Sequence, residues 1–409
     1  MIFLLQPRVA RLLAGRFFEG ISAGLLMMAL PWILLKDGNN GSVVAIIALI
    51  CTLCSFLLTP FFSTAVDRYS RKMIMVIVQL AQAIAALFLL IVFTLPAEVS
   101  DLARILSIAA VQLVFWVSAD LAWNTTGAFI QENFQPDEYP RISAYQEVMM
   151  QGVMLTSGGF GILLLESWSL SQFALFALCA STLSALCYST MPYLRKLREH
   201  IEQSFHGQLV ETRKIFLRDP QLMIFLAMSC LSYPVLTYLV KLVPVFLAEQ
   251  GYSGEWFAIW KSSYGLGAMV CGLVITVLLV KFRSDLLMVV SVLLIALSLS
   301  VMAVVTEPVV IIVMTLGIGF FNATNRISRI NRMNLTTDIQ ERGRIDGGLK
   351  MFSILMQSLS YMLIALLSSW QLTHYGFAVA AVVMLLAGGY MYRFQAKTQR
   401  QIKLIAENS

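Results

Sequence analysis

The chain has 409 residues, of which 58% are hydrophobic and 13% are charged, and its formal net charge is +6. A soluble domain usually carries about 25% charged residues, so this composition excludes an ordinary soluble protein. The apolar residues form long continuous runs instead of alternating segments of about ten residues, which excludes a membrane β-barrel. A helix satisfies its backbone hydrogen bonds internally, and the sequence therefore predicts a series of membrane-spanning helices.

The first apolar run is predicted to be a retained helix and not a cleaved signal peptide. Arg16 and Glu19 interrupt it, and it continues to Trp32 without a small-residue cleavage site. The six cysteines all lie in apolar runs, where we expect packing residues and neither disulfides nor a metal site. We also expect no cofactor.

Hydropathy and turn residues predict twelve spans near the ~20-residue length that crosses a bilayer. The predicted spans are 8–35, 42–66, 72–95, 102–128, 141–165, 168–191, 222–248, 255–281, 285–306, 308–332, 344–369 and 373–393. The charged segment 192–221 separates the sixth span from the seventh and is long enough for an amphipathic helix. We therefore expect an all-α membrane protein with two six-helix bundles, 1–191 and 222–409, joined by a cytoplasmic linker at 192–221.

The distribution of lysine and arginine predicts the orientation in the membrane. These residues gather in the loops on one side of the predicted spans, whereas the other side offers little beyond Lys36 and Arg104. Basic loops stay in the cytoplasm, so we expect both termini on the cytoplasmic side of a bacterial inner membrane.

The two predicted halves resemble each other at one matching position. Segments 140–168 and 343–370 fill the fifth and the eleventh span, and each begins with Arg-Ile after an inner loop and ends on a tryptophan. The sequence therefore predicts a parallel repeat of six helices.

The loop between the second and third spans carries a recognisable motif. It reads Ser63-Thr-Ala-Val-Asp67-Arg68-Tyr-Ser-Arg71-Lys72, and it resembles the signature loop of the major facilitator superfamily, G-x-x-x-D-R-x-G-R-[RK], with serines at two glycine positions. Segment 127–161 is similar to the drug and siderophore exporter branch of that superfamily, which includes macrolide efflux and enterobactin exporters. The resemblance implies a transporter that works by alternating access.

A cytoplasmic gate is predicted around this loop, formed by Asp67, Arg68, Arg71 and Arg344. A carboxylate is stabilised at the positive amino end of a helix, and the expected partner of Asp67 is the start of span eleven, around Arg344. We expect Arg68, Arg71 and Lys72 to hold the loop at anionic lipid. The alternative is that these three are ordinary basic residues of an inner loop.

Intramembrane charges are costly, at least ~2.5–3.5 kcal/mol each, and so they mark candidate functional residues. The first half offers Arg16, Glu19, Asp120 and Glu147. Arg16 and Glu19 are three residues apart on one helix face and are expected to pair. By depth, Asp120 should lie near Arg16 and Glu147 in the same inner half of the membrane, so we expect a cluster of carboxylates and one arginine around a cavity there.

The second half carries only basic residues at membrane depth. We expect a substrate site formed by basic residues of this half together with Arg16 and polar side chains of both halves: Arg16, Asn124, Gln151, Lys241, Asn322, Asn325, Arg326 and Lys350. Arg329 and Arg332 lie closer to the inner end of their span, where a long side chain can reach the surface.

This asymmetry gives the leading hypothesis, which is a proton-coupled exporter of a small amphipathic anion such as a carboxylate siderophore. Because burial makes a carboxyl group easier to protonate, Glu19, Asp120 or Glu147 would carry the proton while the basic half attracts the anion. The alternative for the acids is a static ion pair with Arg16. The alternative for the function is broad drug efflux or lysophospholipid translocation.

Two other classes of protein are less compatible with the sequence. A membrane enzyme would need a catalytic motif, and the chain has no P-loop, HExxH or GxSxG pattern. A receptor or scaffold would be expected to carry a sizeable domain outside the membrane. The expected partners are a small-molecule substrate, protons and membrane lipid, with no nucleic acid, and we expect a monomer.

Overall fold

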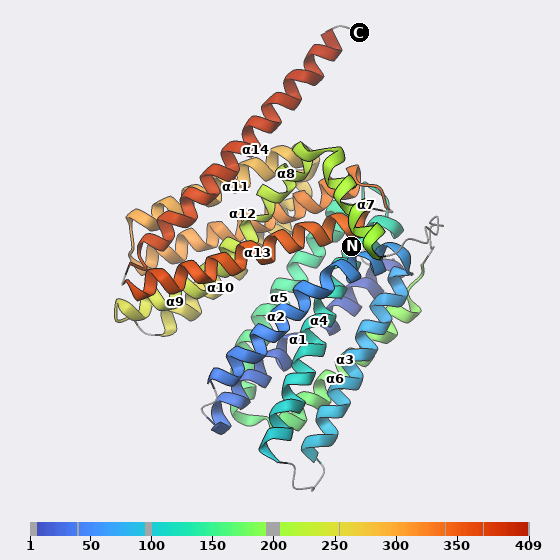
Figure 1. Cartoon of the computed structure of the whole chain (residues 1–409), viewed down its shortest axis with the longest axis vertical. Helices are drawn as coiled ribbons and strands as arrows, with labels where there is room; N and C mark the ends of the chain where they lie inside the picture. Colours follow the sequence, from blue (N-terminus) through green and yellow to red (C-terminus); the bar gives the residue numbers. More distant parts are fainter. Residues whose placement is uncertain are drawn as a thin grey trace. The chain divides into compact units, whose positions relative to one another are not determined.

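The computed structural model describes residues 6–38, 41–94, 100–193, 205–252, 254–339, 341–370 and 372–407. Within these ranges the chain folds into fourteen α-helices and contains no strand (Figure 1). The helices are α1 (Pro7–Gly38), α2 (Gly41–Arg68), α3 (Arg71–Thr94), α4 (Asp101–Asn133), α5 (Tyr139–Ser167), α6 (Leu170–Thr190), α7 (Phe205–Arg218), α8 (Pro220–Cys230), α9 (Ser232–Glu249), α10 (Gly254–Lys281), α11 (Ser284–Val304), α12 (Pro308–Thr336), α13 (Arg342–Ser369) and α14 (Tyr375–Glu407).

The expected all-α membrane architecture with twelve spans is confirmed. Ten stretches of the described residues are long and apolar enough to cross a membrane, and one of them, Pro220–Pro244, joins α8 to α9. The helices α5 and α13 correspond to the predicted spans five and eleven, and with them the described helices are compatible with twelve spans. The remaining helix, α7, lies in the predicted linker between the sixth and seventh spans.

One predicted element is interrupted. Span seven was expected as a single helix over 222–248, but α8 ends at Cys230 and α9 begins at Ser232. A hydropathy profile does not reveal such a break, because the segments on both sides are apolar and only one residue, Leu231, separates the two helices.

The helices form two compact units. Unit 1 contains Met1–Gln135, Met149–Glu202 and Asp338–Gly347, and unit 2 contains Pro136–Val148, Gln203–Thr337 and Gly348–Ser409. Each unit thus holds a short segment from the opposite half of the sequence. As a result, α5 begins in unit 2 and continues in unit 1, whereas α13 begins in unit 1 and continues in unit 2.

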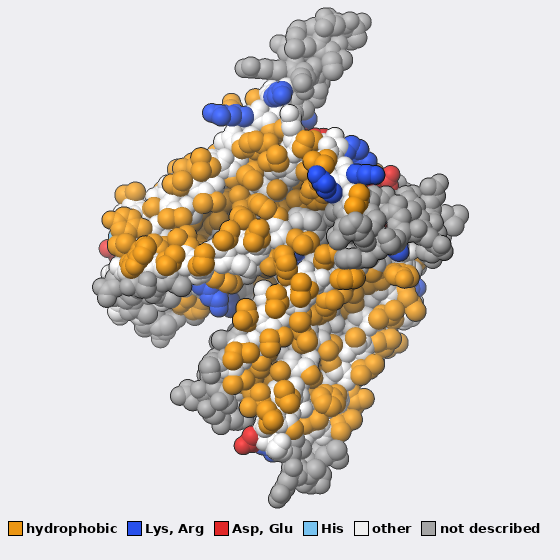
Figure 2. Space-filling view, in the orientation of Figure 1, with side chains coloured by type: hydrophobic (Ala, Val, Ile, Leu, Met, Phe, Trp, Pro, Cys, Tyr) orange, Lys and Arg blue, Asp and Glu red, His pale blue; other side chains and the backbone are white. Residues whose placement is uncertain are grey.

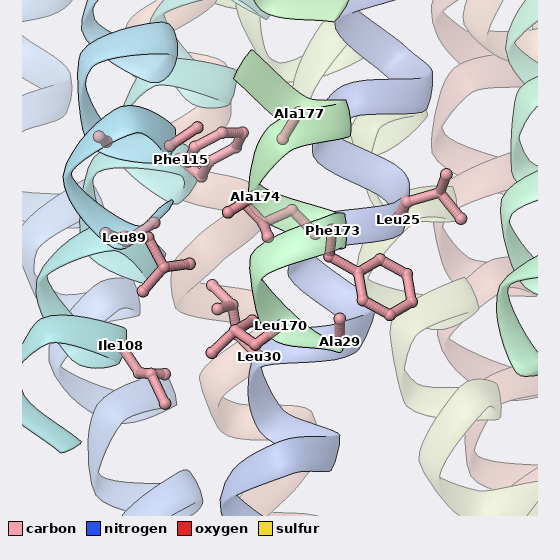
Figure 3. Packing of buried hydrophobic residues seen from close by; sticks show 14 of the residues in the cluster. Leu25, Ala29, Leu30, Leu89, Ile108, Phe115, Leu170, Phe173, Ala174 and Ala177 are labelled. Atoms are coloured by element: carbon pink, nitrogen blue, oxygen red, sulfur yellow. The ribbon is translucent and has the colours of Figure 1, made fainter. Parts of the chain in front are cut away.

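Unit 1 has an apolar core in which α3 and α6 run side by side (Figure 1). Figure 3 shows Leu89 of α3 and Phe115 of α4 on one side of α6, and Phe173 of α6 on the other side, near Leu25 and Ala29 of α1. Outward-facing residues of the same helices are also apolar, and hydrophobic side chains cover much of the face in Figure 2. An apolar surface of this kind is stable in a lipid bilayer, because its side chains contact lipid tails and not water.

In unit 2, α10 and α12 approach each other closely because each contributes a glycine to the contact. A side chain at Gly267 would meet the backbone carbonyl of Leu316, and a side chain at Gly319 would meet that of Tyr264. Small residues at a helix contact let the two backbones pack directly, which is a common device inside membranes.

The starts of α5 and α13 are held in their units by the same kind of close contact. In unit 2, Gly272 of α10 leaves room for Ala144 and Val148 of α5. In unit 1, Gly343 and Gly347 of α13 lie against Ser63 of α2. Both segments contain residues singled out from the sequence, so this packing positions the candidate sites.

Candidate functional site

Asp67 lies against the first turn of α13 in unit 1. Its Oδ1 accepts a hydrogen bond of 2.7 Å from the backbone N–H of Gly343, and its Oδ2 accepts one of 3.1 Å from the backbone N–H of Arg344. The Nε of Arg344 is 3.2 Å from the same oxygen. The carboxylate therefore meets both the unpaired N–H groups and the positive end of the helix, and the contact expected between Asp67 and the start of span eleven is present.

Arg71 is fully buried beside this contact. Its guanidinium donates to the backbone carbonyls of Ala128 at 2.5 Å and Ile339 at 2.7 Å, and its Nε lies 3.8 Å from Glu132 Oε2. The expectation that Arg71 reaches anionic lipid is wrong, because the side chain has no exposed surface. The planar guanidinium instead connects the start of α3 and the last turns of α4 to the residues that precede α13.

The other two basic residues of the loop differ from Arg71. Lys72 donates from Nζ to the backbone carbonyl of Met191 at 2.8 Å, so it satisfies the carboxyl end of α6. Arg68 is half-buried at the last position of α2.

A second cluster lies on α1 and α6 of unit 1. Arg16 Nη1 is 2.8 Å from Glu19 Oε1, and the Tyr188 hydroxyl donates to Glu19 Oε2 at 2.7 Å. Arg16 also lies over the ring of Trp123, with its Cζ 5.9 Å from the ring centroid. The predicted pair between Arg16 and Glu19 is therefore present, with a tyrosine as an additional donor.

Two of the three acids expected near Arg16 lie with it in unit 1, and one of them, Glu19, contacts it. Asp120 of α4 accepts a hydrogen bond from the hydroxyl of Ser55 on α2, and Glu147 belongs to unit 2. Depth along a helix does not give the rotation of that helix, so the partners of these acids could not be predicted from the sequence.

Glu147 forms an ion pair with Arg326 of α12, with Oε2 against Nη2. The carboxylate lies on the part of α5 that packs in unit 2, and its side chain is 3% exposed, against 26% for Arg326. Glu147, a predicted proton site, and Arg326, a predicted substrate residue, are therefore the two partners of one ion pair.

Polar residues at successive turns of α12 make one functional face. Asn322 donates from Nδ2 to the Tyr264 hydroxyl at 2.7 Å. One turn further, Asn325 is fully buried; its Nδ2 donates to the Ser229 carbonyl and the Ser232 hydroxyl, both at 2.9 Å. A break in a membrane helix leaves backbone groups without their usual hydrogen bonds. Asn325 therefore supplies a donor to such a group, the Ser229 carbonyl, at the break between α8 and α9.

Arg329 contributes to the same break. Its Nη1 lies 3.0 Å from the carbonyl oxygen of Ser229. Arg326 and Arg329 are three residues apart and lie on one side of α12, and the Arg329 guanidinium borders the break.

The remaining predicted substrate residues are divided between the two units. Asn124 and Gln151 are buried in unit 1, on α4 and α5. In unit 2, Lys241 is exposed on α9 and Lys350 is half-buried on α13. The role of these four residues in substrate binding therefore stays a prediction.

Sequence reasoning missed several partners of the named residues. They are Tyr188, which bonds to Glu19, Ser55, which bonds to Asp120, Glu132, which pairs with Arg71, and Ser229 and Ser232 at the helix break. A tyrosine or serine in an apolar run is usual, so the only available signal was the clustering of small polar residues around 229–232.

Comparisons with known proteins agree with this architecture. The sequence model of the Major Facilitator Superfamily matches residues 12–328. The chain belongs to the major facilitator superfamily. A search of curated protein sequences found no match.

Several solved structures share the fold. A bacterial homologue of the iron transporter ferroportin in the outward-facing state is 15% identical, with a TM-score of 0.74 over 95% of this chain and 99% of that chain. The human organic anion transporter MFSD10 is 14% identical, with a TM-score of 0.73 over 94% and 99%. The proton:xylose symporter XylE is 10% identical, with a TM-score of 0.70 over 95% and 96%.

These matches identify the chain as a multi-pass membrane protein with the fold of major facilitator transporters, which are generally not enzymes. At such low identity the likeness to solved structures extends to the fold and not to the substrate.

Proposed function

We propose that this major facilitator protein is a proton-coupled secondary transporter that exports a small amphipathic anion by alternating access. The observation that carries the proposal is the polar face of α12 in unit 2. There Arg329 borders a broken helix, and Arg326, three residues before it on α12, bonds to a buried carboxylate, Glu147.

The anionic character of the substrate follows from the charges of that face. Two guanidinium groups and one carboxylate leave an excess of positive charge, and guanidinium binds carboxylates in a bidentate fashion. Broken helices inside transporters commonly line substrate sites, because their free backbone groups must meet a partner. A carboxylate siderophore is one molecule with this chemistry.

Proton coupling is assigned to the carboxylates Glu19, Asp120 and Glu147, of which Glu19 and Glu147 are buried and Asp120 is half-buried. Each has a hydrogen-bonding partner on another helix: Tyr188 for Glu19, Ser55 for Asp120 and Arg326 for Glu147. A change of protonation would therefore change a contact between helices, which is what coupling to a conformational change requires.

The gate is proposed at Asp67 and Arg344. The first residues of α13 belong to unit 1 through this contact, while the rest of α13 belongs to unit 2. Release of the Asp67 carboxylate would free the start of α13 from α2. Arg71 stabilises the gate by donating a hydrogen bond to the carbonyl of Ile339, shortly before α13 begins.

The proposed setting is a bacterial inner membrane, with both termini in the cytoplasm and the protein acting as a monomer. The partners are a small-molecule substrate, protons and lipid. Within the same fold, broad drug efflux or lysophospholipid translocation is the second candidate, although a cationic drug fits the α12 face poorly because Arg326 and Arg329 would repel it.

The test is a metabolite comparison between a strain that lacks the gene and its parent, grown with little iron. Retention of an anionic siderophore inside the mutant, reversed by the wild-type gene and not by an Arg326→Gln variant of equal abundance, is the expected result. An unchanged profile of intracellular and secreted anions would contradict the proposed substrate.

A further inference from the structure

Two glutamines lie in the middle of the inward face of α3. Gln79 and Gln82 are three residues apart, and neither residue has any exposed surface. Among the residues that the structure describes, no protein group forms a hydrogen bond with the amide oxygen or the amide nitrogen of either side chain. Both primary amides are thus enclosed in the core of unit 1 without a protein partner.

Such enclosure is unfavourable for an amide, because the group leaves its hydrogen bonds to water behind when it is buried. Polar groups inside proteins are for this reason paired either with another protein group or with ordered water. We propose that Gln79 and Gln82 form an internal water site in unit 1. The site does not depend on the substrate or on the direction of transport proposed above.

The packing of α3 against α4 brings a hydroxyl group to the depth of this site. The two helices run antiparallel, and Val78 belongs to the same apolar cluster as Ala122 of α4. Val78 and Ala122 therefore lie at the same depth. One turn further along α3 is Gln82, and one turn back along α4 is Ser118, which is also buried.

The register of α3 against its other neighbour, α6, is fixed at both ends. At one end Lys72 donates from Nζ to the carbonyl of Met191 at 2.8 Å. At the other end the Ser171 hydroxyl donates to the carbonyl of Phe93 at 3.3 Å. The helices are therefore antiparallel, and counting equal numbers of residues inward from either contact reaches the same pairs of positions to within about one residue.

This register places two serines of α6 at the depth of the glutamines. Ser184 lies near the depth of Gln79 and Ser181 near that of Gln82, and both serines are fully buried. Each hydroxyl forms a hydrogen bond with a residue of α1. A hydroxyl has one hydrogen and two lone pairs, so each can also accept a hydrogen bond from water. Hydroxyl groups of both neighbouring helices therefore lie at the depth of the two amides.

The chemistry of these groups suits water and not an ion. Amides and hydroxyls are neutral, and both kinds of group can donate and accept hydrogen bonds. Water does the same, and a buried water molecule typically makes about three hydrogen bonds to protein groups that have no other partner. A cation would bind the amide oxygens but leave the amide nitrogens of Gln79 and Gln82 without acceptors.

The first test uses wild-type protein and Met75 as the reporter. Met75 is 1% exposed and lies one turn before Gln79 on the same face of α3. Brief X-ray irradiation converts water, including bound water, into hydroxyl radicals that oxidise the nearest side chains, and mass spectrometry measures the methionine sulfoxide. Met75 should be oxidised at least five times faster than Met384, which is equally enclosed on a face of α14 where its neighbours are alanines. Exposed Met73 reports the radical dose. Equally slow oxidation of Met75 and Met384 would overturn the inference.

The second test removes the site. The double variant Gln79→Leu/Gln82→Leu replaces both amides with apolar side chains, and oxidation of Met75 should fall to the rate of Met384. The matched control is Gln112→Leu, at a buried position six residues from Ser118 along α4, and it should leave the oxidation of Met75 unchanged. Oxidation of Met75 at the wild-type rate in a folded double variant would overturn the inference.

A third measurement distinguishes water from a bound cation. The unfolding temperature of the wild-type protein should be the same in sodium chloride as in choline chloride at equal ionic strength. A stabilisation by sodium that the variant Gln79→Leu/Gln82→Leu loses would overturn the inference, because it would show that the two glutamines bind an ion.

Discussion

Asp67 caps the amino end of α13: its two carboxylate oxygens lie 2.7 Å from the backbone nitrogen of Gly343 and 3.1 Å from that of Arg344. This arrangement gives a physical reason for the acidic residue in the loop motif. The first turn of a helix has N–H groups without intrahelical partners, and a carboxylate satisfies them while it meets the positive helix end.

Replacing Asp67 with alanine should release this turn. The Gly343 and Arg344 amides would lose their acceptor, at a cost of about 1–2 kcal/mol for a lost helix cap. Hydrogen–deuterium exchange of a peptide spanning 342–345 should become at least several times faster. Asp101→Ala is the matched control, because Asp101 lies exposed in the first turn of α4. Unchanged exchange in Asp67→Ala would contradict the capping role.

The glycines between α10 and α12 should be intolerant of even one methyl group. Gly267→Ala and Gly319→Ala each place a Cβ against a backbone carbonyl, which cannot move like a side chain, and should cost about 1–3 kcal/mol. Thermal unfolding of the purified protein should begin at lower temperature. Gly389→Ala is the control, since nothing lies within 4 Å of the added atom. Equal unfolding temperatures for all three variants would show that the helices are not in close contact.

Arg71 should not be replaceable by lysine. A lysine ammonium keeps the charge but lacks the planar fork that reaches the carbonyls of Ala128 and Ile339 together. A hydrogen bond to a charged group contributes about 1.5–3 kcal/mol, so Arg71→Lys should lower the unfolding temperature clearly. Lys72→Arg, at a position that makes one bond to the Met191 carbonyl, should change it little. The prediction fails when the two variants are equally stable.

The contacts that could be predicted from sequence were those fixed by local geometry or by a motif. Arg16 and Glu19 are three residues apart on one helix, so their pairing needs no knowledge of the fold. The partner of Asp67 could be predicted because the motif and the start of α13 occupy fixed places in a repeated architecture.

The contacts that could not be predicted join helices far apart in the chain. Glu147 and Arg326 are separated by 179 positions, and their pairing depends on the rotation of α12 and on α5 beginning in unit 2. The break between α8 and α9 depends on Asn325, which satisfies backbone groups that hydropathy does not see. Arg71 looks like a surface residue in sequence because its burial is created by α4 and the approach to α13.

The pair on α1 offers a way to separate a structural role from a role in coupling. Arg16→Met leaves Glu19 buried with Tyr188 as its remaining donor, and loss of one partner of a buried pair costs about 3–5 kcal/mol. The double variant Arg16→Met/Glu19→Met removes both charges and should recover most of that stability. If Glu19 carries protons, the recovered double variant should still lack proton-driven transport. A stable and fully coupled double variant would show that the pair is only structural.

The central claim is proton-driven export of an organic anion, and transport into inverted inner-membrane vesicles tests it most directly. In vesicles that contain the protein, a pH gradient with an acidic lumen should drive the accumulation of radiolabelled citrate or p-toluenesulfonate. A protonophore should abolish the accumulation, and so should Arg326→Gln. Accumulation of a lipophilic cation such as tetraphenylphosphonium, with no accumulation of either anion, would contradict the account.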